Sequence, residues 1–247
     1  MSLAALISQY YWLEQSLRRH LRESAPPDQS VEYLRLSADF LEGIEQYVPA
    51  DRGEARDQVF FFMSRAIRYQ GINIDGRDVN LALTLASRTD ETLQEPDPET
   101  IVTGPIVTRD AGIEGPFQTI ASVIQSPHRT TLLDENKRFI ATSTSNAKVY
   151  GTRQSRLVGV EMSEMMPRQT YDLIARPYLD ACLGGIDQDY PYRIKTPNET
   201  RLLHCKMRLI ELGQDFPAIL ATYEDITADV SPETMGGFDV PTVVNFA

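Results

Sequence analysis

Cysteine and histidine are scarce in this chain of 247 residues. Its two cysteines, Cys182 and Cys205, are too few for a disulfide framework, so we expect buried thiols in the reduced form. Its three histidines, His20, His128 and His204, stand far apart in the sequence, and no pair has the spacing of metal ligands. A metal site is therefore not expected.

Long hydrophobic runs are also lacking. No apolar stretch approaches the roughly 18 residues that a membrane span needs. Residues 1–11 carry no basic segment ahead of their apolar residues, as a secretory signal would. These absences predict a cytoplasmic protein that does not associate with membranes.

Basic residues are outnumbered, with 24 Lys and Arg against 35 Asp and Glu and a formal net charge of −11. The first hundred residues contain ten arginines, no lysine and seventeen acidic residues. Nucleic-acid binding depends on clustered basic residues that displace counterions from phosphates. Direct contact with nucleic acid is therefore not expected from either half of the chain.

Sequence motifs of common enzyme classes are absent. The chain has no Gly-x-Ser-x-Gly, no phosphate-binding glycine loop, no His-Glu-x-x-His and no Cys-x-x-Cys. The adjacent carboxylates Glu224 and Asp225 end a predicted strand, where a structural role is the simpler interpretation. No cationic neighbour is predicted to activate Cys182, and Lys206 should point away from Cys205. We predict that the protein is not an enzyme.

Residues 1–90 are predicted to form an acidic, all-helical domain. Apolar residues recur at three- and four-residue spacing over 4–23, 28–47 and 53–69. Residues 79–85 alternate as a strand would, but their Leu and Ala content and the acidic residues before them favour a fourth helix. Short amphipathic helices must pack on one another or on a partner. We therefore expect this domain to dimerise or to dock a partner.

A linker is predicted over residues 91–116, where Asp, Glu, Pro, Thr and Gly dominate. Two short β-branched runs within it, 101–103 and 106–108, could form a small ribbon. A second domain then spans residues 117–228, and residues 229–247 form a tail.

The second domain opens with a predicted hairpin over residues 131–142, in which Asn136 is expected to adopt positive φ. An amphipathic helix is predicted over 168–183. Three strands follow, over 190–195, 201–212 and 216–225, the middle one alternating cleanly. The predicted fold class is α+β: an N-terminal helical domain, then a five-stranded antiparallel sheet with flanking helices.

Particular residues between positions 130 and 228 resemble the PAS domain family. The matching positions are Asp134, Arg138, Phe139, Ile140, Gly151, Leu157, Val158 and Gly159, together with the strand and Glu-Asp-Ile-Thr ending over 218–227. Three positions depart from the family pattern: Lys137 replaces a common turn glycine, Ser143 a usual Asn, and Arg156 a usual Glu. The loss of the Asn at position 143 is expected to alter local capping.

The resemblance implies that ligands, where present, bind between the sheet and the helices, but it does not identify them. Flavin-binding relatives carry a reactive Cys in the segment that corresponds to residues 160–166 of this chain. Residues 160–166 contain no Cys. Haem-binding relatives use a His on the long helix, and residues 170–183 contain none. No cofactor is therefore expected, whereas an unidentified small organic ligand remains open.

The predicted ligand pocket comprises residues of the long helix and of two strands: Tyr178, Tyr192, Arg193, Cys205 and Met207. The alternative is that Cys205 and Met207 simply fill a core and that Arg193 is a solvated strand residue. A dimer interface is predicted on the helix before the first strand, through Phe117, Ile120, Ala121 and Ile124. These side chains could instead pack on the domain's own sheet.

The expected function is that of a signalling or regulatory protein. Its PAS-like domain would sense a small molecule or contact another protein, as a homodimer or with a signalling partner. The alternative is the input region of a transcription regulator whose DNA-binding part lies outside this chain. The sequence leaves open whether the chain is a complete protein or a fragment.

Overall fold

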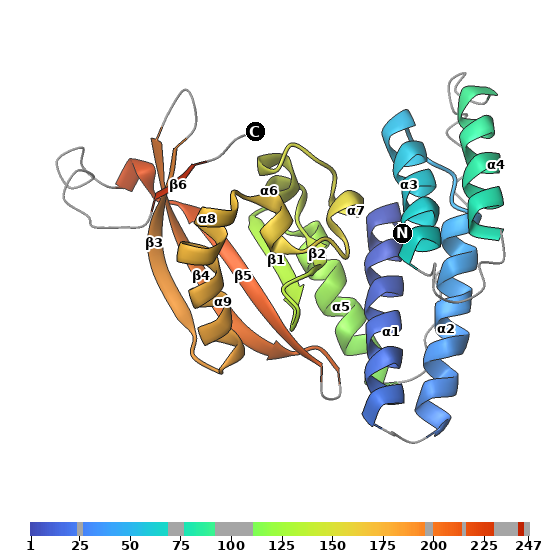
Figure 1. Ribbon diagram of the computed structural model, residues 1–247, viewed down its shortest axis with the longest axis horizontal. Helices are drawn as coiled ribbons and strands as arrows, with labels where there is room; N and C mark the ends of the chain where they lie inside the picture. Colours follow the sequence, from blue (N-terminus) through green and yellow to red (C-terminus); the bar gives the residue numbers. More distant parts are fainter. Residues whose placement is uncertain are drawn as a thin grey trace. The chain divides into compact units, whose positions relative to one another are not determined.

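A computed structural model describes residues 1–23, 27–68, 77–91, 111–195, 200–213, 216–229 and 242–244. The chain forms two compact units, Met1–Thr108 and Arg109–Ala247 (Figure 1). Most of the predicted linker, including the β-branched runs at 101–103 and 106–108, lies outside the described residues.

The first unit is helical, as predicted. Its helices are α1 (Leu3–Glu23), α2 (Pro27–Glu45), α3 (Arg52–Arg68) and α4 (Arg77–Glu91). Helix α1 packs along α2, and α3 packs along α4. The alternating stretch at 79–85 is part of α4, so helix propensity outweighs the strand-like pattern there.

Aromatic side chains and one buried amide hold this unit together. Trp12 of α1 is fully buried and meets the Tyr33 ring of α2 edge-to-face at 5.9 Å. The buried Gln58 of α3 donates from Nε2 to the carbonyl oxygens of Ile44 (2.6 Å) and Tyr47 (3.1 Å). These carbonyls lie in the last turn of α2 or just after it, where Ile44 also accepts from the Tyr47 amide at 3.4 Å, so Gln58 adds a C-terminal cap to the helix.

The second unit combines a sheet with short helices. Its helical segments are α5 (Ala111–Gln125), α6 (Thr144–Val149), α7 (Gln154–Leu157), the 3₁₀ turn Met162–Met165, α8 (Arg168–Thr170), the π turn Tyr171–Ala175, α9 (Arg176–Leu183) and the 3₁₀ turn Thr227–Asp229. Its strands are β1 (Arg129–Asp134), β2 (Phe139–Thr142), β3 (Gln188–Lys195), β4 (Thr200–Glu211), β5 (Pro217–Asp225) and β6 (Thr242–Val244).

The strands are ordered β2-β1-β5-β4-β3-β6. The first five are antiparallel neighbours, which confirms the predicted five-stranded antiparallel sheet and its PAS-like α+β fold. Strand β6 pairs in parallel with β3 and was predicted only as part of the tail. Three residues are too few for a periodic pattern to reveal a strand.

The predicted helix over 168–183 is continuous but changes geometry along its length. Helix α8 leads into the π turn at Tyr171–Ala175, and α9 follows with Pro177 in its first turn. Proline has no amide hydrogen to donate to the carbonyl four residues earlier, and a π turn is one way for a helix to accommodate that loss.

The hairpin between β1 and β2 depends on Asp134, a buried residue whose Oδ1 accepts from the amides of Asn136 (2.8 Å) and Arg138 (2.9 Å). Positive φ falls on Lys137 (φ 60°) and not on Asn136, so that prediction was wrong. The Asp134 carboxylate holds the Asn136 amide, and the chain therefore reverses one residue later.

Replacing Lys137 with glycine should relieve the strain of this left-handed backbone. The Lys137 Nζ also pairs with Asp180 at 2.6 Å, and this hydrogen bond lowers the pKa of Asp180. We expect Lys137→Gly, made in an Asp180→Ala background where the ion pair is already absent, to raise the unfolding free energy by about 0.5–1 kcal/mol. Urea unfolding followed by thiol reactivity measures it, since both cysteines lie in this unit. No gain in that background would contradict the strain argument.

Position 143 keeps a helix cap, with a serine in place of the asparagine that is usual in the PAS family. The Ser143 Oγ accepts from the Asn146 amide (3.2 Å) as the N-cap of α6 and from the Thr130 amide of β1 (3.0 Å). Serine is among the preferred N-cap residues, so it can replace asparagine here without loss of the cap.

Candidate functional site

The inner face of the sheet and the helices α6 to α9 enclose one apolar core. Because side chains alternate along a strand, every second residue of β3, β4 and β5 points into it. The strand residues of the core include Tyr190, Tyr192, Ile194, Leu203, Cys205, Met207, Ile219, Ala221 and Tyr223. The region where the PAS resemblance places ligands, between the sheet and the helices, is therefore occupied by this core.

A row of four residues crosses this face of the sheet. Tyr190 of β3 is paired with Cys205 of β4, Cys205 with Tyr223 of β5, and Tyr223 with Arg129 of β1. We call these four residues the cross-strand row. It places one thiol, two phenols and one guanidinium on adjacent strands of the inner face of the sheet.

Aromatic contacts connect the row to its surroundings. The Tyr190 ring stacks on Tyr178 of α9 at 3.7 Å with an interplanar angle of 9°. Tyr192 lies between Tyr190 (6.2 Å) and Tyr223 (6.5 Å, 76°) on the same face. The four rings therefore form a continuous aromatic wall from α9 across to β5.

The Arg129 side chain is held over this wall. Its guanidinium carbon lies 5.1 Å from the centre of the Tyr223 ring, within the range of a cation–π interaction. Its Nε and Nη2 donate to Oδ1 of the buried Asn146 at 3.4 and 3.3 Å. Asn146 in turn donates from Nδ2 to Thr142 Oγ1 at 3.0 Å. Arg129 is thus positioned by side chains of β2, β5 and α6.

The Tyr223 hydroxyl is buried and has no hydrogen-bond partner among the residues that the structure describes. The residue is only 9% exposed, and burial raises the pKa of its phenol well above the usual value. Burial likewise raises the pKa of Tyr190 and Tyr192, and Arg129 opposes this effect at Tyr192. All three phenols are therefore neutral and able to donate or accept a hydrogen bond.

Both cysteines are free and buried, as expected. Burial raises the pKa of the Cys205 thiol to about 12 and that of Cys182 to about 11. The nucleophilic form of cysteine is the thiolate, which needs a lowered pKa to form near neutral pH. These thiols act as apolar core residues.

Four of the five predicted pocket residues come together in the structure. Tyr192, Cys205 and Met207 belong to the core, and Tyr178 packs against it. Arg193 does not join them. It lies between Tyr192 and Ile194 in β3, and because side chains alternate along a strand, it points to the opposite face of the sheet. Arg129, Asn146 and Tyr223 also lie at this site and were not predicted from the sequence. The alternation of β5 could have revealed Tyr223, whereas Arg129 lies just before the predicted start of the hairpin.

The predicted dimer residues lie on α5. Phe117, Ile120 and Ile124 are buried within the chain, Ala121 is half-buried, and α5 contacts β1 and β2. Their burial fits the alternative of packing on their own sheet. A dimer interface through α5 remains a prediction.

Within the described ranges, no group of three or more His, Cys, Asp or Glu residues is placed to hold a metal ion. None of the described helices combines the length and the hydropathy required to cross a bilayer.

No protein-family model and no curated protein matches this chain. Among solved structures, a domain of an HTR-like protein from Haloarcula marismortui is 19% identical, with 41% of this chain and 100% of that chain covered and a TM-score of 0.35. The Rhodobacter sphaeroides LOV protein is 18% identical, with 45% and 66% covered and a TM-score of 0.36.

The PAS domain of a LuxR-family transcriptional regulator from Burkholderia thailandensis, solved with ethanol, is 13% identical, with 43% of this chain and 95% of that chain covered and a TM-score of 0.34. Similarities this distant carry no information about function. The second unit has the five-stranded antiparallel sheet with flanking helices that the PAS resemblance implies.

Proposed function

We propose that this protein is a non-enzymatic, cytoplasmic sensor. Its PAS-like unit binds a small organic molecule in the core beside the cross-strand row, and its helical unit docks a signalling partner. The observation that carries the sensing role is the buried Tyr223 hydroxyl, which lacks a hydrogen-bond partner next to the Arg129 guanidinium.

An unsatisfied hydroxyl in a core is costly. Burying a polar group without a partner destabilises a protein by about 1–3 kcal/mol, and the large majority of buried polar groups are satisfied. A ligand oxygen placed against Tyr223 would provide the missing hydrogen bond. The positive charge of Arg129 nearby favours a ligand whose polar end is an acceptor or an acid. The rest of the ligand would contact the apolar core.

Methionines on the helical side of the core support this proposal. Met162 and Met207 are buried in the core, and Met165 and Met166 pack against it. Unbranched thioether side chains adapt their shape at low cost. The core can therefore rearrange around a ligand without loss of the sheet.

A catalytic role for the two cysteines is disfavoured by their environment. With pKa values of about 12 and 11, Cys205 and Cys182 hold their protons at neutral pH. The PAS-like core is therefore suited to binding and not to nucleophilic chemistry.

Tyr223→Phe tests the sensing role. Removal of the unpartnered hydroxyl should raise the unfolding free energy of the free protein by about 1 kcal/mol. It should also abolish the thermal shift produced by a responsive compound from a library of small carboxylic acids, phenols and ketones. Differential scanning fluorimetry of the wild type and the variant measures both effects.

Tyr192→Phe is the matched control, since the Tyr192 hydroxyl is not among the buried groups that lack a hydrogen-bond partner, and Arg129 opposes the rise in its pKa. This variant should gain no stability. Destabilisation by Tyr223→Phe, or an unchanged ligand response in that variant, would show that the hydroxyl is not part of a binding site.

A further inference from the structure

Helix α2 of the helical unit carries apolar side chains on its solvent side. Val31 is 63% exposed and Leu34 is 55% exposed, while Ala38 is exposed and Leu41 half-buried. Spacings of three and four residues place them in one line along the helix. The side chains that α2 buries lie on a different side of the helix: Tyr33, Leu36, Phe40 and Ile44. Helix α2 is therefore apolar on two sides, and the described residues bury only one of them.

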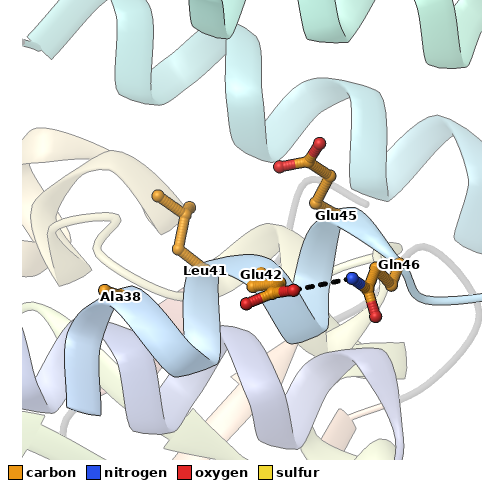
Figure 2. A pocket seen from close by; sticks show the side chains of 5 residues that line it. All are labelled: Ala38, Leu41, Glu42, Glu45 and Gln46. Carbon is orange, nitrogen blue, oxygen red and sulfur yellow. Dashed lines mark hydrogen bonds between the residues drawn. The ribbon is translucent and has the colours of Figure 1, made fainter. Parts of the chain in front are cut away.

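The C-terminal half of this line borders a hollow (Figure 2). Ala38, Leu41, Glu42, Glu45 and Gln46 line it, and its volume of about 330 Å³ is near the lower end for binding pockets. The Glu42 carboxylate accepts a hydrogen bond from Gln46 Nε2 at 2.8 Å. An apolar wall thus lies directly beside two carboxylates. We call Val31, Leu34, Ala38, Leu41, Glu42 and Glu45 the α2 face.

The charge around the α2 face is strongly acidic. The single basic residue of α2, Arg35, is paired with Glu32 at 2.7 Å and with Asp39 at 3.0 Å. Its positive charge is therefore balanced within the helix. Helix α2 as a whole carries five acidic residues, Asp28, Glu32, Asp39, Glu42 and Glu45, against this one arginine.

We infer that the α2 face binds an amphipathic helix of a partner protein, with apolar side chains along its centre and lysine or arginine at its edges. A line of apolar residues at three- and four-residue spacing matches the helix-in-groove mode of recognition. Basic edges would meet Glu42 and Glu45, and complementary charge favours both the encounter and its orientation. The inference rests on the proposed docking role of the helical unit and specifies its partner.

A second copy of the chain fits this surface poorly. Two α2 faces brought together would place Glu42 and Glu45 of one copy near the same acidic surface of the other. Like charges brought together in an interface are unfavourable. The acidic edges thus favour a partner that differs from this chain.

Peptide binding to the full chain tests the inference. The probe is a fluorescently labelled synthetic helix with leucines at i, i+3, i+7 and i+10 and lysines on both sides. One control peptide replaces the lysines with glutamates, and another keeps the composition but scrambles the leucine positions. Fluorescence anisotropy should show binding of the first peptide only, and this binding should weaken as salt is added.

Three variants locate the site. Leu34→Ser with Leu41→Ser should weaken binding about tenfold or more, because it removes the apolar centre without adding charge. Glu42→Gln with Glu45→Gln should weaken binding several-fold and reduce its salt dependence. Leu83→Ser, at a residue of α4 that is 62% exposed, should bind as the wild type does. Trp12 fluorescence verifies folding, since Trp12 packs on α2 through Tyr33.

Three results would overturn the inference. The first is that the Leu34→Ser/Leu41→Ser variant binds the lysine peptide as tightly as the wild type does. The second is that the glutamate peptide binds as tightly as the lysine peptide. The third is that the wild type self-associates in sedimentation and this variant does not. Failure here is distinguishable from failure of ligand sensing. The peptide assay uses the ligand-free chain and Trp12 in the helical unit, whereas the sensing assay depends on Tyr223 in the PAS-like unit.

Discussion

Asp134→Ala is expected to lower the unfolding free energy of the PAS-like unit by about 3 kcal/mol. The buried carboxylate accepts from two amides, those of Asn136 (2.8 Å) and Arg138 (2.9 Å), and a hydrogen bond to a charged group contributes about 1.5–3 kcal/mol. These bonds close the turn between β1 and β2. Because β1 pairs with β5 on its other side, a weakened turn should affect the whole sheet.

The two units report separately on this change. The single tryptophan, Trp12, lies in the helical unit, and both cysteines lie in the PAS-like unit. In urea, the variant should expose its thiols at lower denaturant concentration while the Trp12 transition stays in place. Asp134→Asn keeps the Oδ1 acceptor, so its unfolding free energy should fall by only about half as much as that of Asp134→Ala. If alanine and asparagine have equal effects, the two amide bonds do not stabilise the turn.

Raising the pH from 9 to 12 should destabilise the PAS-like unit by several kcal/mol. The Cys205 thiol has its pKa raised from 9.0 to about 12, and Cys182 from 9.0 to about 11, in both cases first through burial. The fold favours the protonated thiols. Their contribution is therefore fully present below pH 9, where both states are protonated, and is lost as the pH rises through the folded pKa values.

The thiols and the tyrosines lower the unfolding free energy over different ranges of pH. Each thiol should lower the unfolding free energy by up to about 1.4 kcal/mol per pH unit, or about 4 kcal/mol in total for Cys205. Tyrosines in an unfolded chain ionise around pH 10, so Tyr190, Tyr192 and Tyr223 add to the loss mainly above that value. The thiols therefore make their largest relative contribution between pH 9 and 10.

Cys205→Ala provides the control for this pH dependence. Urea unfolding followed by far-UV circular dichroism at each pH should show a shallower decline for the variant than for the wild type between pH 9 and 10. Trp12 fluorescence follows the helical unit in the same samples. Identical slopes for the two proteins would show that Cys205 does not resist ionisation in the fold.

The general architecture was predictable because it depends on local patterns. Periodicity of three to four residues predicted the helices of the first unit, and alternation predicted the strands of the second. The PAS resemblance rested on residues that interact with near neighbours in the sequence. Asp134, for example, closes a hairpin through the amides of its own turn. Interactions that span only a few residues leave a signature in the sequence.

The candidate site was only partly predictable, for a physical reason. Tyr192, Cys205 and Met207 share a face of adjacent strands, and alternation alone places them in the core. Arg129 and Asn146 come from β1 and α6, and they approach Tyr223 only because the sheet brings β1 beside β5. No spacing in the sequence encodes that approach. The choice of Lys137 over Asn136 for positive φ likewise followed from one side-chain hydrogen bond.

The sequence by itself therefore determined the helices, most of the strands, the acidic first half and the buried thiols, since each follows from composition or periodicity. Only the tertiary structure decided which polar groups meet in the core, which side of α2 remains uncovered, and that β6 adds a parallel edge to the sheet. These features depend on contacts between residues far apart in the chain, and such contacts exist only after the strands have paired and the helices have packed.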